Sequence, residues 1–214
     1  MNEAPPERDR WKCTSAYYAR AYLDRAIVRI AAHELCDAGF SIHFICGKIP
    51  PWKGWQVAAA RNHAEIDVQF RLSLVKSGCG VGGRLDLIPR GSAPNIVLDV
   101  DTHGIGDGDD VLRAECMAAV RAIVGDLNPT VITGSGGLHY HLKGDPNVVK
   151  ELFIQTNALK LDWEGRPEGR PLVPPKGKPA PRWILELLGP ERSVVLPPSV
   201  HPDSLQPYRW WSPA

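Results

Sequence analysis

Hydrophobic residues between Thr14 and Cys36 recur at intervals of three and four, which is the spacing of one face of an α-helix. Gly39 follows, and glycine commonly ends a helix because it adopts the left-handed conformation without strain. Similar periodicity occurs in three later segments. They predict further helices at Ala58–Phe70, at Val111–Val124 (with Asp109 or Asp110 as its N-cap) and at about Asn147–Leu159.

Short aliphatic runs bounded by glycine, proline and polar residues are typical of β-strands. The clearest is Asn95–Asp101 (NIVLDVD), a buried-strand pattern that ends in acids. Leu138–Leu142 (LHYHL) alternates in polarity as a strand does. Trp183–Leu188 and Ser193–Leu196 are predicted to pair as a closing hairpin through the LGPER turn. Further strands are predicted at Ser41–Ile45, Leu85–Ile88 and Thr130–Thr133.

Helices and strands therefore alternate, which predicts an α/β or α+β fold with at least one mixed sheet. A chain of 214 residues suits one large domain or two small, tightly joined ones. No repeat and no clear interdomain linker is found. The Pro/Gly/basic stretch at 165–182 is interpreted as a surface insertion.

The composition excludes several classes of protein. Lys+Arg of 25 against Asp+Glu of 24 gives a net charge of +1, which neither requires nor excludes a nucleic-acid partner. No apolar run is long enough to span a bilayer, and the polar N-terminus is unlike a signal peptide. The five cysteines are scattered without a C-x-x-C pair, so no disulfide framework or four-ligand zinc site is predicted. We expect a reduced, cytoplasmic protein with no membrane partner.

Asp99 and Asp101 are the first candidates for chemistry. They lie two residues apart on a predicted strand, so both side chains project from the same face. Two carboxylates held this close repel each other unless a cation lies between them. Mg²⁺ and Mn²⁺ prefer oxygen ligands and also bind phosphates. The alternative is that an acid at a strand end caps the following turn.

The turn TGSGGLH offers a second candidate site. Gly136 and Gly137 allow backbone N–H groups to approach an anion, while Ser135 and His139 supply side-chain donors to a phosphate. A plain hairpin without a ligand would have the same glycines.

His139 and His141 share a strand face, which leaves a competing interpretation open. A His-hydrophobic-His strand binds one metal ion in endonucleases that nick replication origins with a tyrosine nucleophile. The candidate nucleophiles are Tyr17, Tyr18 and Tyr22. This interpretation gives the aspartate pair no role.

Glu186 lies among large apolar residues in WILELL, where a charged residue needs a partner. A metal ion shared with Asp99 and Asp101 would satisfy it, and the alternative is an acid facing water on a half-exposed edge strand. In PPSVHP, consecutive prolines fix the backbone from which Ser199 and His201 present polar groups.

Five segments, taken together and in this order, resemble the prim-pol domain of the archaeo-eukaryotic primase superfamily, the N-terminal bifunctional DNA primase/polymerase domain of many mobile-element replication proteins. They span most of the chain. They are GKIPPWKGW (47–55), VGGRL (81–85), VLDVD (97–101), TGSGGLHYH (133–141) and ELLGPERSVVLPPSVHP (186–202).

The resemblance implies a modified RNA-recognition-type mixed sheet (about 95–214) packed with a smaller α/β module (about 1–94). It implies that the three acids bind two Mg²⁺ or Mn²⁺ ions and are catalytic, although many members have aspartate where this chain has Glu186. It also implies residues that bind the incoming nucleotide and, less firmly, the DNA. The nucleotide-binding set is Ser135, Gly136, Gly137, His139, Lys48, Arg84 and His201, and the DNA-binding set is Trp52, Lys53, Trp55 and Arg182.

The function implied is template-directed transfer of nucleotides from NTP or dNTP, as a DNA primase, a DNA polymerase or both. Single-stranded DNA template and a primer strand would be its partners, with a helicase or helical accessory domain in the same chain or separate. The setting implied is replication of a plasmid, phage or other mobile element. A third possibility is a non-catalytic nucleic-acid-binding module that has kept the fold.

Overall fold

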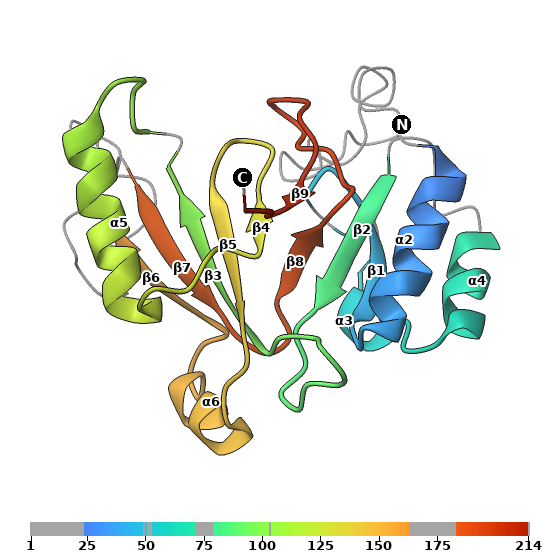
Figure 1. Cartoon of the computed structure of the whole chain (residues 1–214). Coiled ribbons are helices and arrows are strands. Elements are labelled where there is room, and N and C mark those ends of the chain that lie inside the picture. The colour runs from blue at the N-terminus through green and yellow to red at the C-terminus, as the bar shows by residue number, and fades with distance from the viewer. Residues whose placement is uncertain are drawn as a thin grey trace, which may run out of the picture.

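The structure, a computed structural model, describes residues 24–48, 50, 53–71, 79–102, 104–162 and 183–213. Two β-sheets fill the centre of this part of the chain, and the longer helices lie on their outer sides (Figure 1). The helices are α2 (Arg25–Asp37), α3 (Trp55–Ala58), α4 (His63–Arg71), α5 (Asp110–Val124) and α6 (Pro146–Leu152). The strands are β1 (Ser41–Cys46), β2 (Cys79–Arg84), β3 (Ile96–Asp101), β4 (Val131–Ile132), β5 (Leu138–Leu142), β6 (Ala158–Asp162), β7 (Ile184–Leu188), β8 (Ser193–Leu196) and β9 (Arg209–Trp210).

The larger sheet has six strands in the order β6-β7-β3-β5-β4-β9. Alternation along β3 turns Leu98 and Val100 toward α5, where they join a buried cluster with Cys116 and Val120 of that helix. Asp109 caps α5, because its side chain accepts a hydrogen bond from the backbone N–H of Leu112 at 3.2 Å. One face of this sheet is therefore covered by α5, which leaves the other face for the residues that alternate with Leu98 and Val100.

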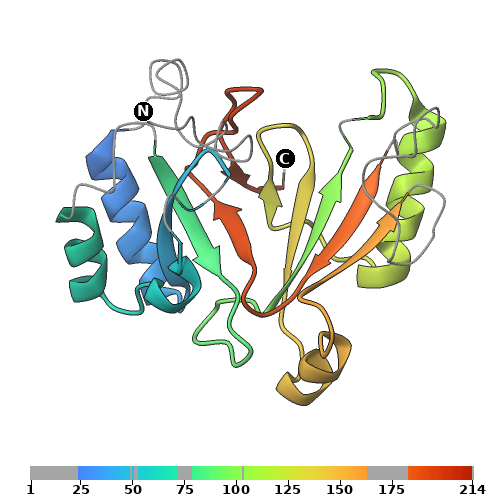
Figure 2. The ribbon, with the colours of Figure 1, turned by 180° about the vertical axis from the view of Figure 1, so that it is seen from behind.

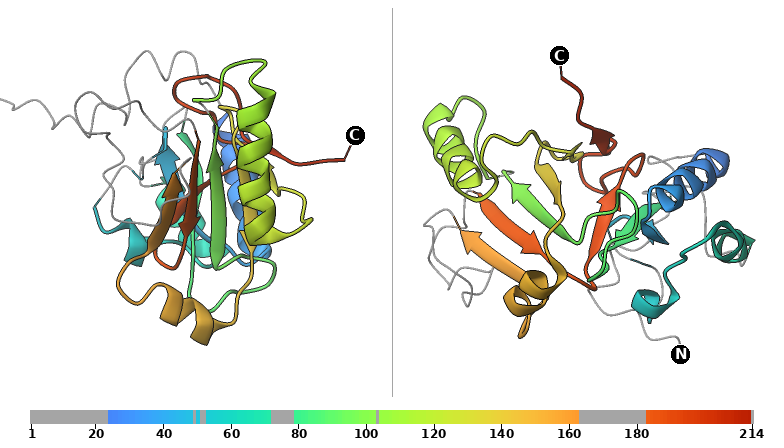
Figure 3. Two further views of the ribbon diagram at one scale, coloured as in Figure 1. Left: turned by 90° about the vertical axis from the view of Figure 1, so that its left-hand side faces the viewer. Right: turned by 60° about the horizontal axis from the view of Figure 1, so that its bottom comes forward.

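The smaller sheet has the order β1-β2-β8, and α2 packs against β1 and β2. Its third strand, β8, comes from the C-terminal part of the chain and lies next to β2 (Figure 2). Val97 of β3 and Leu188 of β7 belong to the same buried apolar cluster as Phe40 and Val81. The two sheets therefore share one core, and both are placed between the outer helices (Figure 3).

Most predicted elements are confirmed within the described residues. The C-terminal half of the first predicted helix is α2, whereas its N-terminal half lies outside the described residues. The strands at Ser41–Ile45 and Asn95–Asp101 and the helix after Asp109 are found with nearly the predicted bounds. The predicted insertion at 165–182 also falls outside the described part.

Four predictions about elements were wrong. Helix Ala58–Phe70 is split into α3 and α4, because Ala60 pairs with Ile42 as an isolated β-bridge. The predicted strand Leu85–Ile88 is irregular, and strand β2 lies before it at Cys79–Arg84. The helix predicted to reach Leu159 ends at Leu152 and gives way to β6.

The fourth error concerns the predicted closing hairpin, and the expectation of a mixed sheet was wrong as well. The strands β7 and β8 exist, but they belong to different sheets, so the LGPER segment crosses between sheets. All described strand pairs are antiparallel, and both sheets are therefore antiparallel rather than mixed. Among the described helices, none combines the length and the apolarity that crossing a membrane requires.

Candidate functional site

Four ionisable side chains form a row across the larger sheet. Asp99 of β3 is paired with His139 of β5 on one side and with Glu186 of β7 on the other. Glu186 is paired in turn with Lys160 of β6. Directly opposed residues on neighbouring strands project from the same face, and Asp101, two residues along β3, projects from that face too. Register therefore brings the three predicted acids to one side of the sheet.

The row borders a pocket of about 180 Å³ between the two sheets. Val97, on the same face of β3 as Asp99, is fully buried in the core that the sheets share. This face of β3 is therefore covered by the core at Val97 and borders the pocket at Asp99 and Asp101. The sequence candidates that line the pocket are Lys48, Asp99, Asp101, Ser135, Gly137, His139 and Glu186.

Asp99 and His139 face each other inside the pocket. His139 Nε2 lies 3.4 Å from Asp99 Oδ1, and the imidazole is buried whereas the carboxylate is 34% exposed. His139 Nδ1 is buried without a hydrogen-bond partner among the described residues. An unsatisfied buried polar atom costs free energy, and the burial of Nδ1 leaves Nε2 as the imidazole nitrogen that faces the Asp99 carboxylate.

The rings of His139 and His141 lie nearly parallel, with an interplanar angle of 24° and centroids 6.2 Å apart. Burial and the neighbouring His139 lower the pKa of His141 to about 3, so its imidazole stays neutral at physiological pH. The three candidate tyrosines of the nicking-enzyme interpretation, Tyr17, Tyr18 and Tyr22, lie outside the described residues.

Two cations neutralise Glu186. Its Oε1 lies 3.2 Å from Lys160 Nζ and 3.1 Å from an Arg192 guanidinium nitrogen. Strand β7 lies between β6 and β3, so the alternative of an acid on an edge strand was wrong. The two cations satisfy this carboxylate in the structure, and its predicted share in a metal site with Asp99 and Asp101 stays a prediction.

The aspartate pair suits a hard divalent cation. Asp99 and Asp101 bring two carboxylates to one wall of the pocket, and carboxylate oxygens are the ligands that Mg²⁺ and Mn²⁺ prefer. Throughout the described ranges, no group of three or more His, Cys, Asp or Glu side chains is placed to hold a metal ion. A site formed by all three acids stays a prediction, and it requires Glu186 to change partners.

The predicted anion-binding turn joins β4 to β5 beside this row. The backbone N–H of Thr133 donates to the carbonyl of Gly137 at 2.8 Å, and the N–H of Gly136 donates back to the carbonyl of Thr133 at 3.0 Å. Gly136 has a φ of +87°, a conformation that favours glycine. The hydroxyls of Thr133 and Ser135 lie 3.1 Å apart at the pocket wall. This compact turn thus presents hydroxyl groups next to His139.

The PPSVHP segment is anchored to the smaller sheet. The Ser199 hydroxyl accepts a hydrogen bond from the N–H of Val81 at 2.8 Å and donates one to the carbonyl of the same residue at 3.0 Å. His201 Nδ1 accepts from the backbone N–H groups of Asp203 and Ser204, so Nε2 carries the proton in the neutral ring. Burial and the charge of Lys48 lower the pKa of His201. This segment supplies structural bonds and a neutral imidazole.

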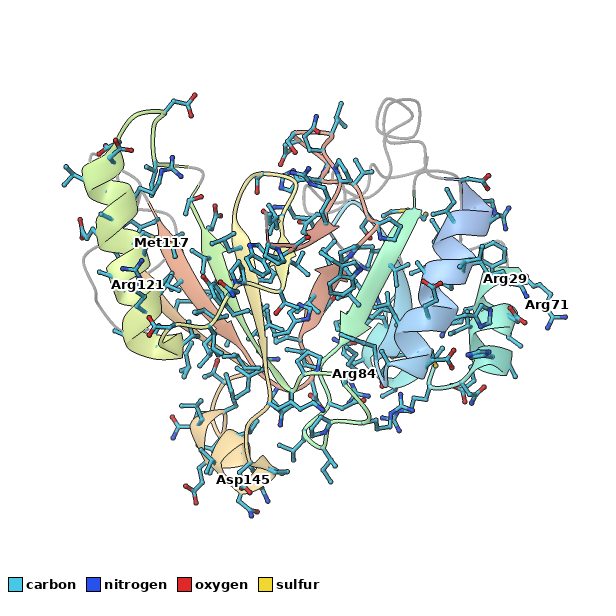
Figure 4. All side chains as sticks on the ribbon, in the orientation of Figure 1. Arg29, Arg71, Arg84, Met117, Arg121 and Asp145 are labelled. Carbon is cyan, nitrogen blue, oxygen red and sulfur yellow. The ribbon has the colours of Figure 1, made fainter. Side chains whose placement is uncertain are left out.

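Several other sequence candidates lie away from the pocket. Arg84 is at the end of β2 (Figure 4), where it pairs with Asp86 at 3.5 Å, so its predicted place at the nucleotide is not supported. The rings of Trp55 and His43 lie with their centroids 4.5 Å apart, and the role of Trp55 in DNA binding stays a prediction. Lys53 is exposed. Trp52 and Arg182 lie outside the described residues.

Sequence reasoning missed three side chains of this site. Arg192 and Tyr208 line the pocket, and Lys160 binds Glu186 from β6. Lys160 directly follows the predicted helix at about Asn147–Leu159, and Arg192 belongs to the LGPER turn of the predicted hairpin. Only the cross-strand register brings them to Glu186, although a half-buried acid among apolar residues is a local signal for basic partners.

Comparison with known proteins agrees with these features. A family model described as "Bifunctional DNA primase/polymerase, N-terminal" matches residues 32–214. No curated protein and no solved structure gives a significant match.

Proposed function

Since residues 32–214 match that model, the chain belongs to the bifunctional DNA primase/polymerase N-terminal family, and we propose that it extends DNA strands by template-directed nucleotidyl transfer. Membership in the family implies DNA and nucleotides as substrates. The observation that carries the proposal is the pairing of Asp99 with both His139 and Glu186 beside one pocket.

Asp99 and Asp101 are the proposed ligands of Mg²⁺ or Mn²⁺, and Glu186 joins them when Arg192 releases its carboxylate. Ions held by these carboxylates would supply activation of the attacking 3′-hydroxyl and charge stabilisation for the leaving pyrophosphate. The carboxylates fit this role because they line one pocket and Asp99 is accessible from it.

The turn and Lys48 are the proposed binding site of the incoming triphosphate. Ser135 offers a hydroxyl and His139 an imidazole, while Lys48 adds a positive charge at the same pocket. Donors fixed in advance orient a phosphate and stabilise its charge without rearrangement during the reaction. His201 supports the turn from behind, because the Cβ of His201 lies against Gly134.

The wider setting is also part of the proposal. Single-stranded template and a primer strand would reach the pocket, with Lys53 as a surface contact to DNA phosphates. Trp52 and Arg182 stay candidates for DNA binding. Replication of a plasmid, phage or other mobile element, with a helicase or helical accessory domain, is the biological context that we favour.

A primer-extension assay tests the proposed function. A labelled primer on a longer template is incubated with Mg²⁺ or Mn²⁺ and with either NTPs or dNTPs, and a parallel reaction omits the primer. We expect metal-dependent extension that the variant Asp99→Asn lacks. No incorporation under any of these conditions would refute a catalytic role, and a covalent protein–DNA adduct would favour the tyrosine nicking enzyme instead.

A further inference from the structure

The connection between β7 and β8 is fixed to both sheets. The carbonyl of Arg192 accepts a hydrogen bond from the N–H of Leu85 at 2.9 Å, and the N–H of Glu191 donates to the carbonyl of Leu85 at 2.8 Å. On the other side, the N–H of Gly189 donates to the carbonyl of Asn157 at 3.0 Å. The backbone at Arg192 is therefore held in place, while its side chain, 39% exposed, extends into the pocket.

Glu186 has one more cation than its charge requires. Arg192 and Lys160 contact the same carboxylate oxygen, at 3.1 Å and 3.2 Å. The two cations differ in position, because Lys160 is the cross-strand partner of Glu186 in β6 whereas Arg192 lines the pocket. Lys160 alone can balance the carboxylate, so Arg192 is free to bind a second anion within the pocket.

The geometry of phosphoryl transfer indicates which anion that is. Attacking and leaving oxygens lie on opposite sides of the reacting phosphorus. The turn that would hold the pyrophosphate lies next to His139, on the β5 side of Asp99. The attacking 3′-hydroxyl then approaches from the opposite, β7 side, where Glu186 and Arg192 lie.

We infer that Arg192 binds a backbone phosphate near the 3′ end of the primer strand, exchanging Glu186 for that phosphate while Lys160 keeps the carboxylate neutralised. A guanidinium can contact two phosphate oxygens at once, which fixes the orientation of a strand end as well as attracting it. Arg192 is thereby a positioning residue for the attacking hydroxyl, and this inference rests on the proposed function.

Binding of DNA without metal tests the contact directly. A fluorescent duplex with a recessed 3′ end is titrated in EDTA and followed by anisotropy, with thermal melting to confirm that each variant is folded. We expect Arg192→Ala to raise the Kd roughly five- to tenfold, as the loss of one charge-assisted contact would, and Arg192→Lys to have a smaller effect. Arg121→Ala is the matched control, because it removes an exposed arginine from α5, which covers the opposite face of the larger sheet, and its Kd should stay within about twofold.

A neutral linkage in the primer separates a phosphate contact from a general loss of charge. Methylphosphonate is placed singly at each of the three linkages nearest the 3′ end. One of these modified primers should bind the wild-type protein more weakly than the unmodified primer does. The Arg192→Ala variant should bind that modified primer and the unmodified primer equally well, because the loss of one partner of a contact already removes the contact. Equal weakening by Arg121→Ala, or no linkage that discriminates the wild-type protein from Arg192→Ala, would overturn the inference.

The same variants distinguish this inference from the proposed function. In extension assays Arg192→Ala should raise the KM for primer–template and leave the KM for the nucleotide unchanged, whereas His139→Ala should do the reverse. An effect of Arg192→Ala on the nucleotide KM alone would overturn the primer assignment. Arg192-dependent binding of the recessed end without any incorporation would support the contact and refute the catalytic proposal. Absence of DNA binding by the wild-type protein would overturn both.

Discussion

Asp99 lies between two ionisable residues on the neighbouring strands, His139 and Glu186. The His139 imidazole approaches it at 3.4 Å from β5, and Glu186 is opposite it on β7 with its own charge balanced by two cations. At 34% exposed, the Asp99 carboxylate is reachable from the pocket. Lys160 and Arg192 offset the charge of Glu186, so the Asp99 carboxylate is the accessible acidic ligand that the pocket offers a divalent cation.

Replacing one pocket carboxylate tests this arrangement at the scale of a residue. Asp101→Asn keeps the shape and the hydrogen-bonding capacity of the side chain but removes its charge. We expect nucleotide incorporation to fall at least about a hundredfold, comparable to the loss of one electrostatic group in other active sites, with an unchanged unfolding midpoint. Asp107→Asn, on the exposed loop after β3, is the control and should retain activity. Substantial activity of Asp101→Asn would contradict a metal site at this pair.

Two buried imidazoles make stability depend on pH. Burial lowers the pKa of both His43 and His141 to about 3. In the unfolded chain an imidazole titrates near pH 6.5, so between these values the unfolded state binds more protons than the folded state. The free energy of unfolding is therefore undiminished above about pH 6.5 and falls as the pH drops toward about 3.

Urea denaturation at several pH values between about 4.5 and 6.5 measures this slope. Each such histidine contributes up to about 1.4 kcal/mol per pH unit at full protonation of the unfolded state. His43→Gln should make the curve shallower, because one of the two groups no longer titrates. Its bond to Ser193, at 3.0 Å in the wild type, can be kept by the amide. An unchanged slope would show that burial does not keep His43 neutral in the folded protein.

At the scale of elements, strand β2 requires glycine for close packing against its neighbour. Gly82 is paired with His43 across β1 and β2. A Cβ on Gly82 would lie 2.2 Å from the Cε1 atom of His43, which is fully buried. Glycine is therefore needed here for close approach. No local sequence pattern predicts this need for glycine, because it depends on the partner strand.

Adding one methyl group tests this packing. Gly82→Ala should lower the free energy of unfolding by about 1–3 kcal/mol, the usual cost of overfilling a packed core. Gly106→Ala is the matched control, since nothing lies within 4 Å of the added Cβ, and it should change stability by less than about 0.5 kcal/mol. Urea denaturation of the three proteins gives both values, and equal stabilities would disprove the tight contact.

At the scale of the whole molecule, the chain crosses between its two sheets more than once. Strand β8 returns from the larger sheet to pair with β2, and Val97 and Leu188 of the larger sheet pack in the core of the smaller one. Residues 79–84 therefore pair on one side with a strand from the C-terminal part. The division into modules at about 1–94 and 95–214 stays a prediction. In the folded protein the two parts share strand pairing and a core.

Cooperative unfolding follows from this shared core. Calorimetry of the full chain should show a single transition whose van't Hoff and calorimetric enthalpies agree. Near- and far-ultraviolet circular dichroism should then give coincident melting curves. Two resolved transitions would show that the sheets form separate cooperative units.

The sequence by itself determined the elements whose signals are local. Aliphatic runs ending in acids specify β3, apolar periodicity with Asp109 as cap specifies α5, and the spacing of Asp99 and Asp101 places both on one face of their strand. These features depend on neighbours within a few residues, which the backbone geometry links directly.

Tertiary structure alone decided what surrounds that face. The pairing of Glu186 with Asp99, the cations Lys160 and Arg192 beside it, and the departure of β8 to the other sheet all depend on contacts between distant segments. A one-residue change of register would move a side chain to the opposite face, and no local pattern fixes which strand becomes the neighbour. The charge balance of the pocket is therefore a property of the fold.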